Sequence, residues 1–277
     1  MKTRKPAVAG KFYPGTKKEI INLLDTIYQK EKSFINTGLS EFNIIGGIVP
    51  HAGYMFSAYQ AIHFFEIIKN SSSKFETIFI INPNHTGYGN KLALDENDFW
   101  ETPFGNVEID REFMNELNLP VSADAHMYEH SGEVMLPMLQ NYLDYEFKIV
   151  PISISRQTVE NAKLIANSIF NANKKLNKKI LIIASSDFSH YVEPKAGKKL
   201  DDYVVEEILK FNSENIYKHI INKRISVCGY GPIMTLIEYS KLLEKNIETK
   251  ILKRGHSGEV MPSNEVVDYI SFLFYER

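Results

Sequence analysis

Three apolar runs typical of buried strands each end in a turn that carries a histidine. They lie in the segments Gly46–His51, Thr77–His85 and Ile180–His190. The carboxyl ends of buried strands in a parallel or mixed α/β sheet share one edge, and ligands bind there. Histidines that separate strands bring to such an edge suit a metal or acid–base chemistry. The pattern therefore predicts an active site at one edge of a sheet.

Segments with apolar residues at helical spacing separate these strands. The first helix is expected to begin near Thr16, because Thr16 and Glu19 have the T-x-x-E form of a capping box. Strands and helices alternate, and no repeat or Pro/Gly-rich linker divides the chain, so we predict one α/β/α layered domain over residues 1–277 with a mixed, largely parallel central sheet. Further helices are predicted at 110–117, 159–169, 198–210, 215–222 and 232–245, and further strands at 91–94, 106–109, 146–153, 248–253 and 266–274.

Composition and charge mainly exclude kinds of partner and of cellular location. The 277 residues are 44% hydrophobic, and 32 basic against 34 acidic residues give a formal net charge of −2. This balance predicts no nucleic-acid partner and no binding to anionic membranes. A single cysteine allows no intrachain disulfide, the basic N-terminus lacks the apolar stretch of a signal peptide, and no apolar run approaches about 20 residues. We therefore expect a soluble cytoplasmic protein.

Residues around the three histidines favour chemistry there. Ala52 and Gly53 follow His51 and allow a metal or ligand to approach the backbone closely. Asp187 stands three residues before His190, so the two could act as an orienting carboxylate and a general base. Each histidine, taken singly, is equally well explained as a hydrogen-bonded residue at a strand end.

Other motifs are weaker. Ser185 and Ser186 lack the G-x-S-x-G surroundings of a nucleophile and are interpreted as cap or turn residues. The segment His126–His130 has the H-x-x-E-H form of inverted zinc peptidases, but Ser131 then looks like a helix cap and helical periodicity is missing, so we interpret the match as accidental. His130 and Glu133 are retained as pocket-lining candidates.

Three more residues have simpler expected roles. His63 and His219 are predicted to lie on the surface. Cys228 precedes a predicted helix, a position that can lower a thiol's pKa, but alone it is best explained as a small buried apolar residue. The role of His256, in a Gly-rich loop, stays open.

Taken together, several short segments resemble the Memo family, known in microbes as AmmeMemoRadiSam system protein B. No segment is decisive singly, but their number and order make the resemblance specific. They are Arg4 with Pro6–Gly10 and Phe12–Pro14, Pro50–Tyr54, Asn82–His85, Glu129–Ser131 with Glu133 and Leu136–Pro137, Ser185–His190, and Cys228–Gly229 with Pro232–Ile233.

The resemblance implies the fold of class III extradiol (LigB-like) dioxygenases, in which two histidines and one carboxylate bind Fe(II). By that likeness His51 and His85 are expected metal ligands and His190 is the expected acid–base. The Memo family has cysteine at the third ligand position, which here is Cys228. Thiolate is softer than carboxylate, so Cu or Zn are alternatives to Fe(II), and catechol ring cleavage does not follow from the fold.

Three functions remain open at this stage. The first is a metal-dependent redox enzyme in which Asp187 orients His190 or a bound water, and Tyr54, His130 and Glu133 line the pocket. The second is a non-catalytic adaptor that keeps the pocket for a small-molecule or peptide ligand. The third is metal-assisted hydrolysis. The family name also implies an association with a radical-SAM enzyme and a third protein.

Overall fold

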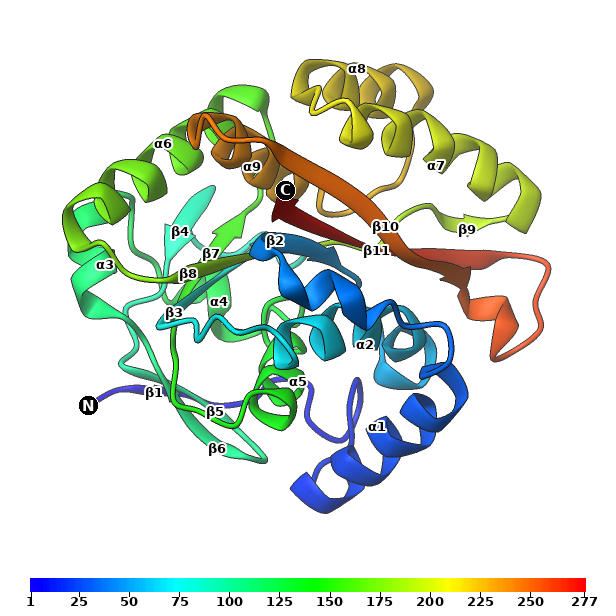
Figure 1. The fold of residues 1–277 in the computed structure, drawn as a ribbon, viewed down its shortest axis with the longest axis horizontal. Helices are drawn as coiled ribbons and strands as arrows, with labels where there is room; N and C mark the ends of the chain where they lie inside the picture. Colours follow the sequence, from blue (N-terminus) through cyan, green and yellow to red (C-terminus); the bar gives the residue numbers. More distant parts are fainter.

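The computed structural model describes residues 1–277 and contains a mixed eight-stranded sheet between two layers of helices (Figure 1). The strand order is β10-β11-β2-β8-β3-β7-β4, and β9 pairs with β11 outside this order. The strands are β1 (Thr3–Arg4), β2 (Asn43–Val49), β3 (Thr77–Pro83), β4 (Leu92–Leu94), β5 (Phe99–Thr102), β6 (Gly105–Glu108), β7 (Lys148–Ile154), β8 (Ile180–Ser185), β9 (His190–Val192), β10 (Ile247–His256) and β11 (Val266–Glu276).

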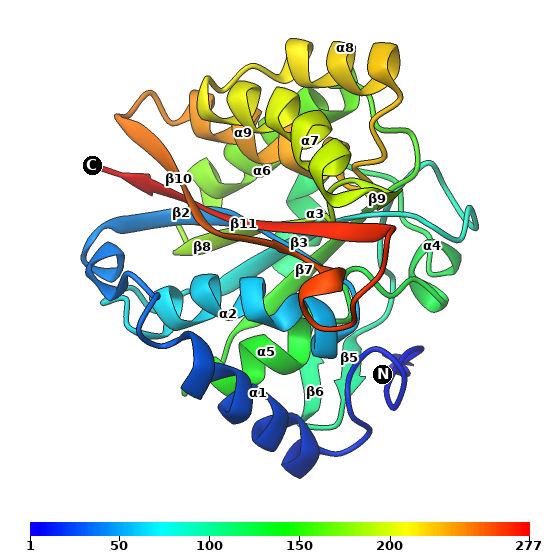
Figure 2. The ribbon, with the colours of Figure 1, turned by 90° about the vertical axis from the view of Figure 1, so that its right-hand side faces the viewer.

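The helices cover both faces of this sheet. In Figure 2, α1, α2 and α5 lie below the sheet, whereas α6, α7, α8 and α9 lie above it. They are α1 (Lys17–Glu31), α2 (Tyr54–Lys69), α3 (Arg111–Leu117), α4 (Asp124–Met127), α5 (Met135–Tyr142), α6 (Val159–Leu176), α7 (Pro194–Leu209), α8 (Ser213–Lys223) and α9 (Tyr230–Leu242), with short 3-10 helices at Thr37–Glu41 and Ser257–Glu259 (η2). The predicted α/β fold with a mixed central sheet is confirmed.

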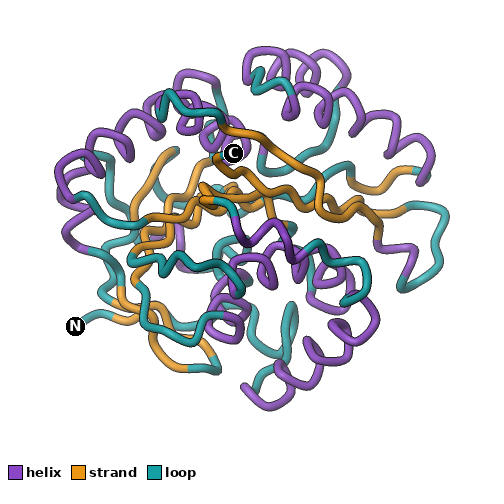
Figure 3. Tube along the Cα trace, in the orientation of Figure 1, coloured by secondary structure: helices purple, strands orange, loops and turns teal.

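The four central strands are parallel to one another. β2 pairs with β8, β8 with β3, and β3 with β7, and every residue of β3 and β8 is buried. Continuous apolar runs are what strands covered on both faces require. Gly46 in β2 is needed for close packing, because a Cβ there would lie 2.2 Å from the carbonyl oxygen of Ile182. Figure 3 shows the strands in the middle of the molecule with the helices around them.

Most predicted elements form near the expected positions. Thr16 caps α1 by accepting a hydrogen bond from the backbone N–H of Glu19. Asp110 caps α3 in the same way through Phe113. The prediction that His63 lies on the surface is wrong, because α2 is buried on almost all sides and His63 is 1% exposed. No helix is long and apolar enough to span a membrane.

A three-stranded sheet of β1, β5 and β6 lies beside the main one and fixes the N-terminal arm, residues 3–14. Arg4 in this arm is buried, stacks on Trp100 at 4.2 Å and forms a 2.8 Å ion pair with Glu133. Its guanidinium also donates to the carbonyl oxygens of His126 and Glu129, both at 2.7 Å. The arm is thereby joined to the segment between α4 and α5.

Candidate metal centre

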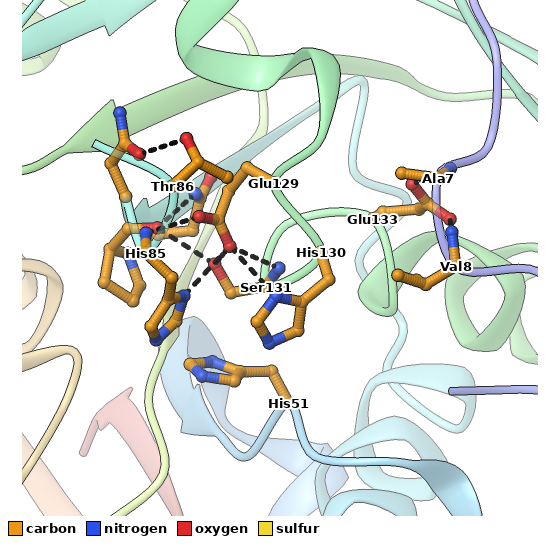
Figure 4. Close-up of polar contacts among 12 residues, drawn as sticks. Ala7, Val8, His51, His85, Thr86, Glu129, His130, Ser131 and Glu133 are labelled. Carbon is orange, nitrogen blue, oxygen red and sulfur yellow. Dashed lines mark hydrogen bonds and ion pairs between the residues drawn. The ribbon is translucent and has the colours of Figure 1, made fainter. Parts of the chain in front are cut away.

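The three strands that lead to the predicted histidines are neighbours in the sheet, in the order β2-β8-β3. His51 follows β2 and His85 follows β3, while Cys228 lies just before α9. One donor atom from each of these three residues lies within 4.8 Å of the others. Figure 4 shows the rings of His51 and His85 side by side, with His130 next to them. The fold therefore brings together the three expected ligands.

The tautomer of His51 is set by a hydrogen-bond relay. Its Nδ1 lies 2.7 Å from the hydroxyl of Ser185, and this hydroxyl donates to the carbonyl oxygen of Ser131, also at 2.7 Å. Because Ser185 has one proton to give, it accepts from His51, which places the ring proton on Nδ1. The lone pair of Nε2 then faces the Cys228 Sγ, 3.2 Å away. Burial, and then the neighbouring imidazoles, lower the pKa of His51 well below its usual range.

Glu129 orients His85 by a similar contact. Its Oε1 lies 3.0 Å from His85 Nδ1, and its Oε2 accepts from the backbone N–H of His85. Burial alone would raise the pKa of Glu129, but hydrogen bonds from His85 and Ser131 outweigh it and lower this pKa to about 2. A carboxylate that holds Nδ1–H leaves Nε2 free for a metal, the arrangement of many metal-binding histidines.

Cys228 supplies the sulfur donor. The backbone N–H of Asp187 donates to its Sγ at 3.2 Å. Although the residue is partly accessible, burial of the thiol and then the charge of Asp187 raise its pKa well above the usual range. The next residue must be small, because a Cβ on Gly229 would lie 2.2 Å from the carbonyl oxygen of Ser185. Gly229 thus lets the start of α9 approach the end of β8.

Asp187 contacts His51 rather than His190. Its Oδ1 accepts from the backbone N–H of His51 at 2.8 Å, and its Oδ2 lies 3.9 Å from Nε2 of that ring. Burial raises the pKa of Asp187 to about 6. The expected orienting contact from Asp187 to the His190 ring is absent from the structure.

His190 is instead oriented by Ser226. Its Nδ1 lies 2.8 Å from the carbonyl oxygen of Ser226, and its backbone N–H donates to the hydroxyl of the same residue at 2.8 Å. A carbonyl oxygen only accepts, so the ring proton sits on Nδ1 and Nε2 is free to take a proton. His190 is only half-buried, unlike His51.

The three expected pocket-lining residues lie in different surroundings. The His130 ring is 4.8 Å from that of His85 and 5.4 Å from that of His51, so it borders the donor group. Tyr54 is 1% exposed, and its hydroxyl donates to the carbonyl oxygen of Val134. Glu133 is fully buried and lies against the N-terminal arm in Figure 4. Its carboxylate accepts from Arg4, Ala7, Val8 and Tyr13.

The H-x-x-E-H match does not form a metal-binding helix. Helix α4 contains only Asp124–Met127 and ends before Glu129 and His130. His126 is fully buried, with Nε2 3.0 Å from the carbonyl oxygen of Ala93. His126 therefore lies apart from the other two residues of the motif, Glu129 and His130, which both lie beside His85.

Two residues that orient the histidines had not been expected in that role. Ser185 appeared as a cap or turn residue, yet its hydroxyl fixes His51. Glu129 appeared only within short motifs, yet its carboxylate holds His85. The position of Ser185 at the end of β8 could have indicated its role, because residues at that edge of the sheet lie near the site. The partner of His85 is 44 positions away and leaves no such local signal.

Sequence comparison shows the family to which the chain belongs. The profile of the Memo-like protein family matches residues 4–273. The chain belongs to the Memo family. It is 38% identical to a MEMO1 family protein of Methanococcoides burtonii, over 98% of this chain and 99% of the relative. A MEMO1 family protein of Methanobrevibacter smithii is also 38% identical, with the same coverage.

A structural match was also found for this Memo-family chain. The crystal structure of an uncharacterized protein from Escherichia coli K12 aligns with a TM-score of 0.49 and 12% sequence identity. The alignment covers 76% of this chain and 91% of the other.

The donor set fits a transition-metal ion. Two imidazoles, each with Nδ1 engaged, and one thiol present two nitrogen atoms and one sulfur atom to a common point. Imidazole suits zinc, copper and iron, and thiolate suits the softer of these ions. A metal would also take the proton's place on a thiol that burial otherwise keeps neutral.

Proposed function

We propose that this Memo-family protein is a metal-dependent oxidoreductase whose metal is held by His51, His85 and Cys228, with His190 as the acid–base. Fe(II) is our first candidate, and Cu or Zn are alternatives that the same donors accept. One observation carries the proposal: three donor atoms from distant parts of the chain lie within 4.8 Å of one another. In both histidines Nδ1 is held by the protein, and Nε2 of His51 lies 3.2 Å from the third donor, Cys228 Sγ.

The ligand chemistry favours a redox role. When bound, a redox-active ion supplies one-electron chemistry and polarises a substrate oxygen. The protein's own residues bind and orient, since Ser185 and Glu129 hold the two imidazoles by Nδ1. His190 holds its proton on Nδ1 and can receive another at Nε2 from a substrate hydroxyl.

The exposure of the donors suggests how ligands enter. His51 is buried, whereas the side chain of His85 is 34% exposed. Solvent therefore reaches the centre from the side of β3. Because a thiolate ligand is readily oxidised, we propose that the protein works in a reducing compartment, as the cytoplasm is.

Metal titration of the 277-residue chain without a histidine tag tests this proposal. Under anaerobic conditions we expect one equivalent of Fe(II) or Cu(I) to bind the wild type, and His85→Asn or Cys228→Ala to weaken that binding by at least about 100-fold. His190→Gln should keep the metal and lose redox turnover. Lys2→Met, an exposed surface change, serves as the control. Wild-type protein that binds none of Fe, Cu or Zn would overturn the proposal.

A further inference from the structure

Ser189, the residue before His190, is held at each of its polar groups. Its N–H and its hydroxyl both donate to Oδ1 of Asp201, at 3.1 and 2.6 Å. Its carbonyl oxygen accepts from the backbone N–H of Asp268 at 2.8 Å, and the N–H of Phe188 donates to the carbonyl oxygen of Asp268 at 2.9 Å. Ser189 is fully buried. Asp201 in α7 and Asp268 in β11 thus fix the backbone from which His190 projects.

The two carboxyl groups also face each other. Asp201 is 0% and Asp268 is 4% exposed, and the groups lie within hydrogen-bonding reach of one another. The Oδ2 atom of each has no N–H or O–H donor in the protein. Two buried carboxylates would leave two acceptors unsatisfied and two like charges in contact, both of which are costly. One proton held between them removes both costs.

Arg254, the nearest cation, does not replace this proton. Arg254 Nη2 lies 3.6 Å from Asp201 Oδ2, beyond a good hydrogen bond. The same guanidinium is engaged by the carboxylate of Asp202 and by the carbonyl oxygen of Lys198. It therefore lowers the charge around the pair without donating to the unsatisfied oxygens.

We propose that Asp201 and Asp268 share one proton and, as a pair with a single negative charge, position His190 for its role at the metal centre. The positioning part rests on the proposed function, while the shared proton does not. Asp201 keeps the charge, because its Oδ1 accepts two hydrogen bonds from Ser189. Asp268 then carries the proton and donates it across the pair.

The surroundings allow this proton to exchange. Asp268 borders a cavity of about 330 Å³, and none of the residues that line it is hydrophobic. Burial, and then the neighbouring Asp201, raise the pKa of Asp268 to about 8. The charged and titratable groups that face the pair or the cavity come from three elements: Lys195, Lys198 and Asp202 on α7, Arg254 and His256 on β10, and Glu259 in η2.

The sign of the pH dependence follows. An unfolded aspartate loses its proton near pH 4, whereas the folded pair keeps one up to about pH 8. The folded state therefore binds one more proton than the unfolded state in between, and stability falls as pH rises through that window. Asp268→Asn cannot titrate, and its amide can donate to Asp201 as the carboxylic acid does.

Urea unfolding of the 277-residue chain between pH 5 and 7 tests the shared proton. Relative to Asp268→Asn, the unfolding equilibrium constant of the wild type should rise by nearly tenfold per pH unit. Asp25→Asn, at an exposed position of α1 on the other face of the sheet, is the control and should keep the wild-type dependence. An Asp268→Asn variant with the same pH dependence as the wild type would overturn the proposal.

NMR tests the positioning role without any added metal, so the result does not depend on metal binding. Asp268→Asn should leave the His190 ring resonances and the slow exchange of the Ser189 amide unchanged. Asp201→Ala should shift the His190 ring resonances and make the Ser189 amide exchange at least tenfold faster. Unchanged His190 resonances in folded Asp201→Ala would reject the positioning role. Because Asp201→Ala can unfold the chain, Ser189→Ala provides a second disruption with the same expected shift of His190.

Discussion

The Nδ1 of His51 and the hydroxyl of Ser185 lie 2.7 Å apart, and this contact decides which nitrogen of His51 can bind a metal. Ser185 ends β8 and His51 follows β2, the strand paired with it in parallel. The pairing of β2 with β8 thus determines that Nε2 of His51 carries the free lone pair.

Removal of this hydroxyl should therefore weaken metal binding. For Ser185→Ala we expect the metal dissociation constant to rise about 10- to 100-fold, because the His51 ring loses the partner that fixes its tautomer. Competition with a chromophoric chelator measures this change. Ser240→Ala is a matched control, because Ser240 is also buried and its hydroxyl bonds only within α9. Equal affinities for the two variants would contradict the role given to Ser185.

The identity of the third ligand should control metal preference. Cys228→Asp replaces a soft sulfur donor by a hard oxygen donor and creates a set of two histidines and one carboxylate. We expect the variant to keep measurable Fe(II) binding while its Cu(I) affinity falls by at least about 100-fold. Anaerobic titrations with both ions measure the ratio of the Fe(II) affinity to the Cu(I) affinity. A parallel loss of both affinities would mean that Cys228 matters for packing rather than as a donor.

The buried ion pair between Arg4 and Glu133 should account for most of what the N-terminal arm contributes to the stability of the fold. Arg4 and Glu133 have side chains that are 2% and 1% exposed. Arg4→Met leaves a buried carboxylate without its cation, so we expect the free energy of unfolding to fall by about 3–5 kcal/mol. Urea denaturation at pH 7 checks this value. Lys2→Met, which breaks an exposed pair with Glu96, should cost less than about 1 kcal/mol.

His63 should make the protein sensitive to mild acid. Burial lowers its pKa below 6.5, against the attraction of Glu31, whose Oε2 is 3.0 Å from Nε2. The unfolded chain binds a proton there more readily, so stability should fall as pH drops below about 6.5. His63→Gln keeps a donor and cannot titrate, so its acid sensitivity should be weaker by up to about 1.4 kcal/mol per pH unit. Thermal unfolding between pH 7 and 5 measures the difference, with His219→Gln as control.

The strands and their histidines could be predicted because their signals are local. An apolar run followed by Pro50–His51 or Asn82–His85 is visible in a few residues. Cys228 was not visible in this way, because its position before α9 looks like that of a core residue and its partner His51 is 177 positions away. Its role came from the resemblance to a family.

The surface position predicted for His63 and the contact predicted between Asp187 and His190 were wrong, also because the signals that decide them are not local. Periodicity tells which face of a helix is apolar, but α2 is covered on almost all sides, so its polar residues are buried as well. The spacing of Asp187 and His190 suggested a contact, but the backbone leaves β8 so that Asp187 turns to His51. Such outcomes depend on elements that pack from elsewhere in the chain.

The position of β11 has a consequence for the order in which the protein is made. Residues 266–276 lie in the sheet between β10 and β2, and Asp268 in this strand holds Ser189. Strands β2 and β11 can pair only after residues 266–276 have left the ribosome. The nascent protein would expose His51 and His85 long before Cys228 and β11 emerge, so the native centre forms only after residue 276 has been made.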